Sequence, residues 1–202
     1  MTEHSYSNRQ RMIAGLIAAI AFVALAVQPT LGEWSYLENL GGVLRFFTIW
    51  GNVAACGVMA AIAAGVRVSD RIMASLATML AVIGLVYWGL LAGDHNPVGL
   101  DRLTNQSHHT IIPAAFVGWW VMCTPPSTSG LQAVPAIMVP PLTYGAFAAI
   151  LGELTGFYAY FFLDLPALGW GQFLINNVVL AAFFALLGAG LVTLKNRFGR
   201  SA

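Results

Sequence analysis

The sequence predicts an all-α, polytopic membrane protein: a bundle of six transmembrane helices with both termini in the cytoplasm. Of its 202 residues, 58% are hydrophobic and 8% are charged, whereas about a quarter of the residues in a soluble domain are charged. Six stretches, of which five are apolar and one is partly polar, each match or exceed the roughly twenty residues that a helix needs to cross a bilayer. An even number of crossings also gathers most basic residues on one side, as the positive-inside rule requires.

The six predicted spans belong to a single transmembrane domain, residues 1–202. They cover about 12–31, 41–66, 72–91, 103–123, 131–151 and 173–194. The first span follows a polar leader, and we interpret it as a retained helix because removal as a signal peptide would disturb the charge pattern. The fifth span contains Pro135, Pro140 and Pro141, so we expect it to be kinked but present.

The positions of the charges favour six spans. Among Lys and Arg residues, seven lie on the side of the termini and two on the opposite side. The seven are Arg9, Arg11, Arg67, Arg71, Lys195, Arg197 and Arg200, and the two are Arg45 and Arg102. The opposite side carries Glu33, Glu38, Asp94, Asp101, Glu153 and Asp164, while Glu3 and Asp70 share the side of the termini. This imbalance predicts cytoplasmic termini.

The fourth predicted span breaks the apolar pattern. Residues 104–109 read Thr-Asn-Gln-Ser-His-His, and polar side chains at membrane depth usually face a bundle interior or a wet cavity where something binds or reacts. Pro113 lacks the N–H that would pair with the carbonyl of residue 109. We therefore expect the helix to loosen beside His109.

Polar residues within the predicted spans gather in the outer halves, which predicts one outward-facing polar cavity. They are Thr48, Asn52, Tyr87, His108, His109, Asn176 and Asn177. A different interpretation of Tyr87 and the asparagines is that they form interhelical hydrogen bonds, each contributing about 0.6 kcal/mol. Ionisable groups inside a span are more often functional, which favours the histidines as site residues.

Arg45, Thr48 and Asn52 are spaced i, i+3 and i+7, so they would form one stripe on a continuous helix. Thr48 and Asn52 would then lie at a depth similar to that of His109, with Arg45 reaching the outer surface. A hydroxyl becomes a useful nucleophile when a neighbouring base takes its proton, and histidine suits that task near neutral pH. The alternative interpretation is that Thr48 has no catalytic role and forms a hydrogen bond to the backbone of its own helix.

Five short motifs, in order along nearly the whole chain, carry a resemblance to a known family. They are Arg45-Phe-Phe-Thr-Ile-Trp-Gly-Asn52, Gly84-Leu-Val-Tyr-Trp88, His109-Thr-Ile-Ile-Pro113 with Trp119, Pro141-Leu-Thr-Tyr144, and Tyr160-Phe-Phe-Leu-Asp164 with Gly169. Together they resemble the bacterial branch of the androgen-induced membrane protein family, whose animal members include the androgen-dependent regulator of tissue factor pathway inhibitor. The chain departs from the family's pattern at Trp50, Gly51, Ala159 and Phe161, changes that bear on acyl preference more than on the reaction type.

The resemblance implies a multi-span hydrolase of fatty acid esters of hydroxy fatty acids, in the cytoplasmic membrane of a bacterium. Matched by motif, Thr48 would be the nucleophile and His109 the base. We expect Asn52 to donate to the developing oxyanion. The further candidates for binding substrate or oxyanion are Arg45, Tyr87, His108, Asn176, Tyr160 and Asp164, and the aromatic segment 157–162 would suit an interfacial lid.

Other functions stay open at this point. An acyltransferase would use the same Thr48 and His109 with an alcohol in place of water. A non-catalytic lipid or small-molecule carrier would keep the cavity without contact between those two residues. We expect no metal or cofactor, since adjacent histidines on a helix point about 100° apart, and Cys56 and Cys123 lack ligand spacing. A net charge of +1 without a basic patch argues against a nucleic-acid partner.

Overall fold

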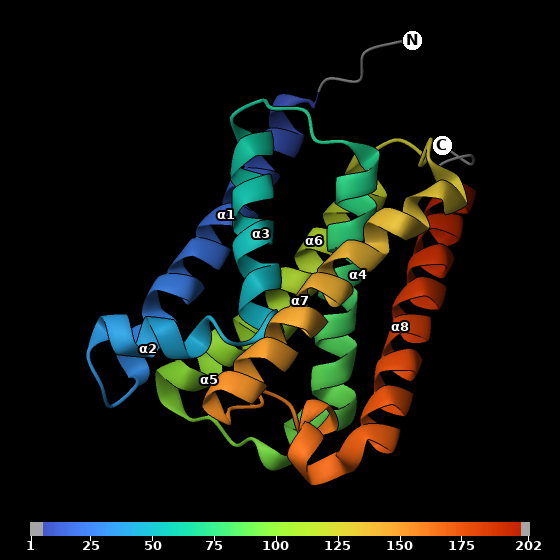
Figure 1. Ribbon diagram of the computed structural model, residues 1–202. Helices are drawn as coiled ribbons and strands as arrows, with labels where there is room; N and C mark the ends of the chain where they lie inside the picture. Colours follow the sequence, from blue (N-terminus) through green and yellow to red (C-terminus); the bar gives the residue numbers. More distant parts are fainter. Residues whose placement is uncertain (1–5, 199–202) are drawn as a thin grey trace.

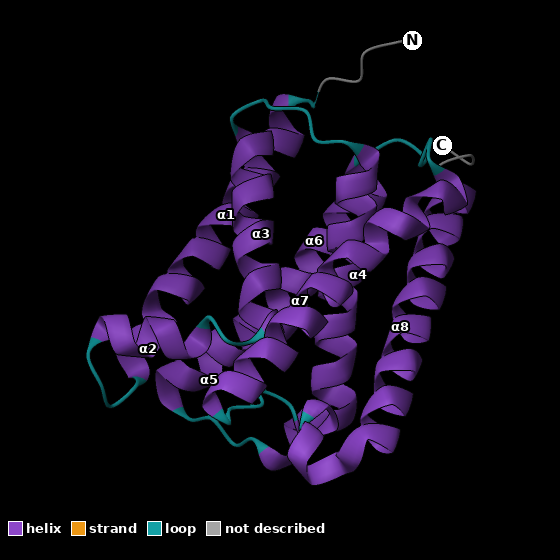
Figure 2. Ribbon diagram, in the orientation of Figure 1, coloured by secondary structure: helices purple, strands orange, loops and turns teal. Residues whose placement is uncertain are grey.

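The computed structural model describes residues 6–198, and within them the chain forms helices and connecting loops without a strand (Figures 1 and 2). The longer helices are α1 (Asn8–Val27), α3 (Phe47–Ala63), α4 (Asp70–Val86), α6 (Ile112–Cys123), α7 (Val134–Thr155) and α8 (Leu165–Phe198). The short ones are η1 (Gln28–Leu31), α2 (Tyr36–Val43), η2 (Tyr87–Leu91), η3 (Ala92–Asp94), α5 (Gly99–Gln106), η4 (Ser107–Ile111), η5 (Gly130–Ala133) and η6 (Phe161–Leu163). The predicted all-α class is confirmed.

Four helical segments are long and apolar enough to cross a membrane. They are Asn8–Leu31, Asp70–Leu91, Gly130–Thr155 and Leu165–Arg197, and a bent pair, Tyr36–Val43 with Phe47–Ala63, makes a fifth if it counts as one span. These segments are consistent with an integral membrane protein. The helical run through α5, η4 and α6 is not among them, and its first half holds the polar residues 104–109.

The prediction of one continuous helix over 41–66 is wrong. α2 ends at Val43, α3 begins at Phe47, and their axes differ by 99°. Between them Phe46 has an extended backbone, with φ −98° and ψ 135°. Arg45 therefore lies outside α3 and cannot share a helical stripe with Thr48 and Asn52, and its guanidinium lies over the ring of Phe157, 5.0 Å from the centroid.

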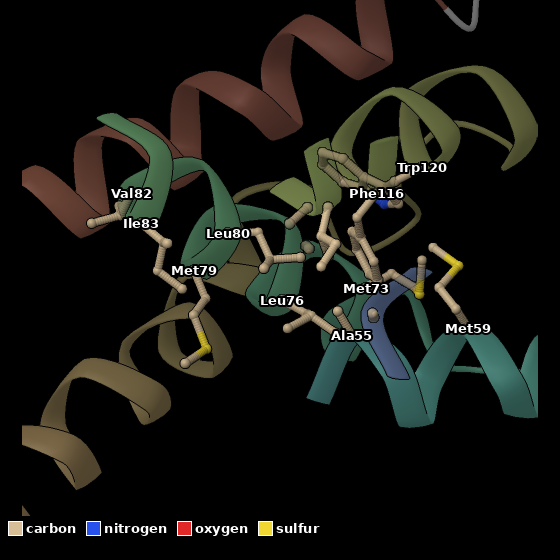
Figure 3. Packing of buried hydrophobic residues seen from close by; sticks show 14 of the residues in the cluster. Ala55, Met59, Met73, Leu76, Met79, Leu80, Val82, Ile83, Phe116 and Trp120 are labelled. Carbon is tan, nitrogen blue, oxygen red and sulfur yellow. The ribbon is translucent and has the colours of Figure 1, made fainter. Parts of the chain in front are cut away.

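α4 is the centre of the bundle. It packs against α3, α6, α7 and α8, and ten of its seventeen residues are buried. A helix that is apolar on nearly every side belongs in a protein interior. Figure 3 shows Met73, Leu76 and Leu80 of α4 among side chains from its neighbours, including Met59 of α3 and Phe116 of α6.

The ends of the bundle differ in charge. The first residues of α1 and the last residues of α8 lie at the same end (Figure 1), together with the connections 64–69 and 124–129. That end carries Arg9, Arg11, Arg67, Arg71, Lys195 and Arg197, while Glu3 and Arg200 lie outside the described residues. α2, α5 and the segment between α7 and α8 lie at the other end (Figure 1).

The proline-containing α7 is a single helix that continues through Pro140 and Pro141. It ends at Gly156, whose φ of +72° is left-handed and suits a residue without a side chain. The chain then turns through η6 and enters α8, whose first turn is closed by the Asp164 carboxylate accepting from the N–H of Ala167 at 3.2 Å. α8 is longer than the predicted 173–194 and contains a non-helical Gly169.

Candidate active site

A wide helical turn surrounds the two histidines. In η4 the backbone hydrogen bonds join residues that are five apart, so the N–H of Ile112 donates to the carbonyl of Ser107. By the same register the carbonyl of His108 would take its bond from residue 113, which is a proline without an N–H. The loosening predicted beside His109 is therefore present as a π-helical turn.

Asn52 supplies a donor to that carbonyl. Its Nδ2 atom lies 3.2 Å from the carbonyl oxygen of His108 and 2.8 Å from that of Thr48. An amide nitrogen carries two hydrogens, so both are engaged by backbone oxygens, and the Asn52 side chain is fully buried. The predicted oxyanion role does not fit this geometry, in which Asn52 ties α3 to η4.

A second π-helical turn, η2, continues α4 and was not predicted. Its first residue, Tyr87, stacks on the ring of His109 with centroids 3.9 Å apart and planes inclined by 19°. The indole Nε1 of Trp88 donates to the hydroxyl of Thr110 at 3.0 Å. The two π-helical turns thus contact each other through neighbouring residues. Such turns are rare and are frequently found at functional sites.

Gly84 permits this approach of the two helices. A Cβ atom placed on Gly84 would lie 3.1 Å from the carbonyl oxygen of His109 and 3.9 Å from Cβ of Pro113. Glycine is the residue that allows so close an approach to backbone. Tyr87 lies three residues further along the same face of the helix, so the contact at Gly84 holds Tyr87 against His109.

Thr48 and His109 are in hydrogen-bonding contact. Thr48 is the second residue of α3, and its Oγ1 atom lies 3.3 Å from Nε2 of His109. The other ring nitrogen, Nδ1, lies 3.1 Å from the carbonyl oxygen of Asn105. A carbonyl only accepts, so Nδ1 carries the proton, and Nε2 of the neutral ring is left as the acceptor for the Thr48 hydroxyl. Here a backbone carbonyl orients the histidine.

Thr48 and His109 line a cavity of about 150 Å³ between α3, α4, α7 and α8. Its other polar lining residues are Tyr144, Tyr160 and Asn177, and the remaining walls are formed by aliphatic, methionine, proline, glycine and phenylalanine residues. The cavity is therefore more apolar than the one predicted, because Asn52 and Asn176 bond to backbone carbonyls and Tyr87 and His108 lie outside its lining.

Two tyrosines lie over the start of α3. Tyr160 lines the same cavity as Phe47 and Thr48, and its hydroxyl interacts electrostatically with the Thr48 side chain and with the backbone of both residues. The Tyr144 hydroxyl donates to the carbonyl of Arg45 at 2.9 Å, across the break that precedes α3. The first N–H groups of a helix have no partner within it and attract negative charge. Tyr160 and these N–H groups therefore form a cluster of donors beside the Thr48 hydroxyl.

Besides Asn52, five predicted site residues do not line the cavity: Arg45, Tyr87, His108, Asn176 and Asp164. His108 is only 2% exposed and belongs to the packed interior. Asn176 donates to the carbonyl of Phe162 at 3.0 Å, Asp164 caps α8, and Arg45 lies over Phe157. Of the tentative residues, Tyr87 contacts the His109 ring and Tyr160 interacts with Thr48.

Tyr144, Gly84 and the carbonyl of Asn105 were missed as parts of the site. Tyr144 and Gly84 each belong to a motif that carried the family resemblance, and that was their signal. The Asn105 carbonyl has no sequence signal beyond its position four residues before His109. Comparison of the chain with protein-family models, with curated proteins and with solved structures finds no match.

The contact at Gly84 can be tested by adding one methyl group. We expect Gly84→Ala to lower the midpoint of thermal unfolding in detergent, because the new Cβ would crowd the His109 carbonyl and overpacking costs about 1–3 kcal/mol. Gly57→Ala is the matched control, since Gly57 is also within a helix and its Cβ would meet nothing within 4 Å. An equal midpoint for the two variants would contradict the close approach.

Proposed function

We propose that the protein is an intramembrane esterase that cleaves fatty acyl esters, with Thr48 as nucleophile and His109 as general base. The contact between Thr48 Oγ1 and His109 Nε2 at 3.3 Å carries the proposal. Three further features support it: the ring orientation set by the Asn105 carbonyl, the apolar cavity beside the pair, and the family resemblance of the motifs that contain both residues. A carrier would not require that contact.

In the first half of the reaction, His109 Nε2 accepts the proton of Thr48 as Oγ1 attacks the ester carbonyl carbon. The carbonyl oxygen becomes an oxyanion, and the donors at this end of the cavity would be the Tyr160 hydroxyl and the N–H groups of Phe47 and Thr48, the first two residues of α3. Collapse of this intermediate breaks the bond to the leaving alkoxide. His109 returns the proton to that oxygen, so an alcohol leaves and the acyl group stays on Thr48.

In the second half, water takes the place of the alcohol. His109 accepts a proton from water, the hydroxide attacks the acyl carbon, and the ester bond to Thr48 breaks with return of the proton to Oγ1. The products are a fatty acid and the free enzyme. Fatty acid esters of hydroxy fatty acids are the substrates that the resemblance implies.

We also propose that the chain crosses the cytoplasmic membrane of a bacterium six times, with both termini inside. Six basic residues of the described chain lie at the end of the bundle that holds the termini, against Arg45 and Arg102 at the other, an imbalance that favours a cytoplasmic location for that end. The crossing beyond the five apolar ones would be the run through α5, η4 and α6, in which Thr104, Asn105 and His108 are buried in the bundle. In this orientation Thr48 and His109 lie in the outer half.

The nucleophile is tested with purified protein in detergent, a p-nitrophenyl ester and a fluorophosphonate probe. We expect Thr48→Ala to abolish labelling and turnover, and Thr48→Ser to retain labelling because it keeps a hydroxyl. His109→Ala should lower turnover by at least about 10²-fold, the usual loss of a general base. His108→Ala, in the same helical turn, should cost distinctly less.

Labelling that survives Thr48→Ala would remove Thr48 from the mechanism. A larger loss for His108→Ala than for His109→Ala would transfer the base to His108. Size exclusion and thermal unfolding of each variant exclude misfolding as the cause.

The oxyanion donor is tested by removing one hydroxyl. We expect Tyr160→Phe to lower kcat by roughly 10²-fold with little change in KM, as for other lost oxyanion donors. The ring should stay in place, because it stacks on Phe162 with centroids 5.2 Å apart. Tyr158→Phe is the control, since that hydroxyl donates to Glu153 away from the cavity. Similar kinetics for both variants would exclude Tyr160 as a donor.

The orientation is tested by labelling single cysteines in intact cells, after Cys56 and Cys123 have been replaced by alanine. We expect a membrane-impermeant maleimide to react with Asn96→Cys, which lies in the loop before α5, and not with Val66→Cys, which lies between α3 and α4. The reverse pattern would invert the proposed topology.

A further inference from the structure

The cavity extends from the Thr48 and His109 pair into the apolar part of the bundle. α4 contributes Val82 and Ile83, about one turn deeper than Tyr87, and α8 contributes Ala181 and Phe184, deeper than Asn177. α7 runs antiparallel to α8 and contributes Met138 and Leu142. Beyond its polar end at Thr48 and His109, the cavity is thus lined by three helices that contribute only apolar side chains.

One wall of the cavity reaches the outer face of α7. Leu142 lines the cavity and is nevertheless 62% exposed. It lies on the same outward face of α7 as Val139 and Ile150, which are 55% and 62% exposed. α7 belongs to a segment that is long and apolar enough to cross a membrane, so this exposed face would contact lipid chains. A lipid could therefore reach Thr48 without leaving the bilayer.

The deep end of the cavity is closed by a contact among three helices. A Cβ atom on Gly188 of α8 would lie 2.8 Å from two carbons of Ile137 and 3.1 Å from the Thr78 hydroxyl, and Ile137 is fully buried. α4, α7 and α8 therefore pack tightly at this level. Met138, the next residue on α7, lines the cavity just above the closure. Its side chain is unbranched and flexible.

We propose that the acyl chain of the ester enters this cavity from the bilayer past Leu142 and that Met138 sets the length of chain that fits. The proposal rests on the proposed esterase function. The acyl half is the appropriate occupant because it stays attached to Thr48 until water arrives, whereas the alcohol must leave. Each methylene buried in such a site contributes about fourfold to binding.

The test compares the hydrolysis of p-nitrophenyl esters from butyrate to palmitate. We expect Met138→Trp to lower kcat/KM for the longest esters by about tenfold or more while butyrate changes by less than about threefold. Met138→Ala should move the preference toward longer chains. Leu186→Trp is the matched control: it adds the same ring at an exposed position of α8 that does not line the cavity, and should leave the chain-length profile unchanged.

Binding is measured independently of turnover with a diazirine-bearing palmitic acid, using the Thr48→Ala protein in phosphatidylcholine vesicles. We expect crosslinks on α7 and α8 at the cavity, and Met138→Trp in the same background should reduce them. Turnover with an unaltered chain-length profile for Met138→Trp, or crosslinks confined to the lipid-facing surface, would overturn the acyl site while leaving the esterase intact. Cavity crosslinks without ester turnover in the wild type would refute the esterase and retain a fatty-acid site.

Discussion

The absence of one N–H group, at Pro113, shapes the whole site. A helix that meets a proline must leave a carbonyl without its backbone donor, and here the turn before it widens to the π form and the His108 carbonyl takes its bond from Asn52 of α3. The neighbouring His109 carbonyl faces Gly84 of α4. One proline thus leaves backbone carbonyls of the histidine turn exposed to their neighbours, and α3 and α4 contact the turn at these carbonyls.

The break before α3 is the second constraint. In a continuous helix over 41–66, the N–H groups of Phe47 and Thr48 would donate to carbonyls of the preceding turn. In a helix that begins at Phe47, these N–H groups have no partner within the helix. It also places Thr48 at the positive end of the helix dipole, where negative charge is favoured. Tyr160 and Tyr144, which come from beyond and within α7, cover this end. The position of Thr48 and the free N–H groups beside it therefore derive from one interruption of a helix.

The sequence was sufficient for the all-α class, the apolar helices and the loosened turn, because composition and a proline act locally. The sequence also led to the hypothesis that Thr48 and His109 form a pair on neighbouring helices. It failed where tertiary contacts decide: the 99° bend that displaced Arg45 from the predicted stripe, and the bonds of Asn52 to two carbonyls. Asn176 and Asp164 are polar in sequence but satisfied by backbone partners, and no sequence pattern distinguishes such residues from those that face a cavity.

The choice of a carbonyl rather than a carboxylate beside His109 follows from the surroundings. The cavity walls are largely apolar, and transferring an ion from water into such an interior costs several kcal/mol even after relaxation. The Asn105 carbonyl fixes which ring nitrogen carries the proton without adding a formal charge. It lies four residues before His109, in α5, so the helix that leads into the widened turn supplies the partner of the histidine. A Thr and His pair oriented in this way keeps the site neutral at rest, and in the proposed reaction charge would develop there only while the ring holds the proton and the donors hold the oxyanion.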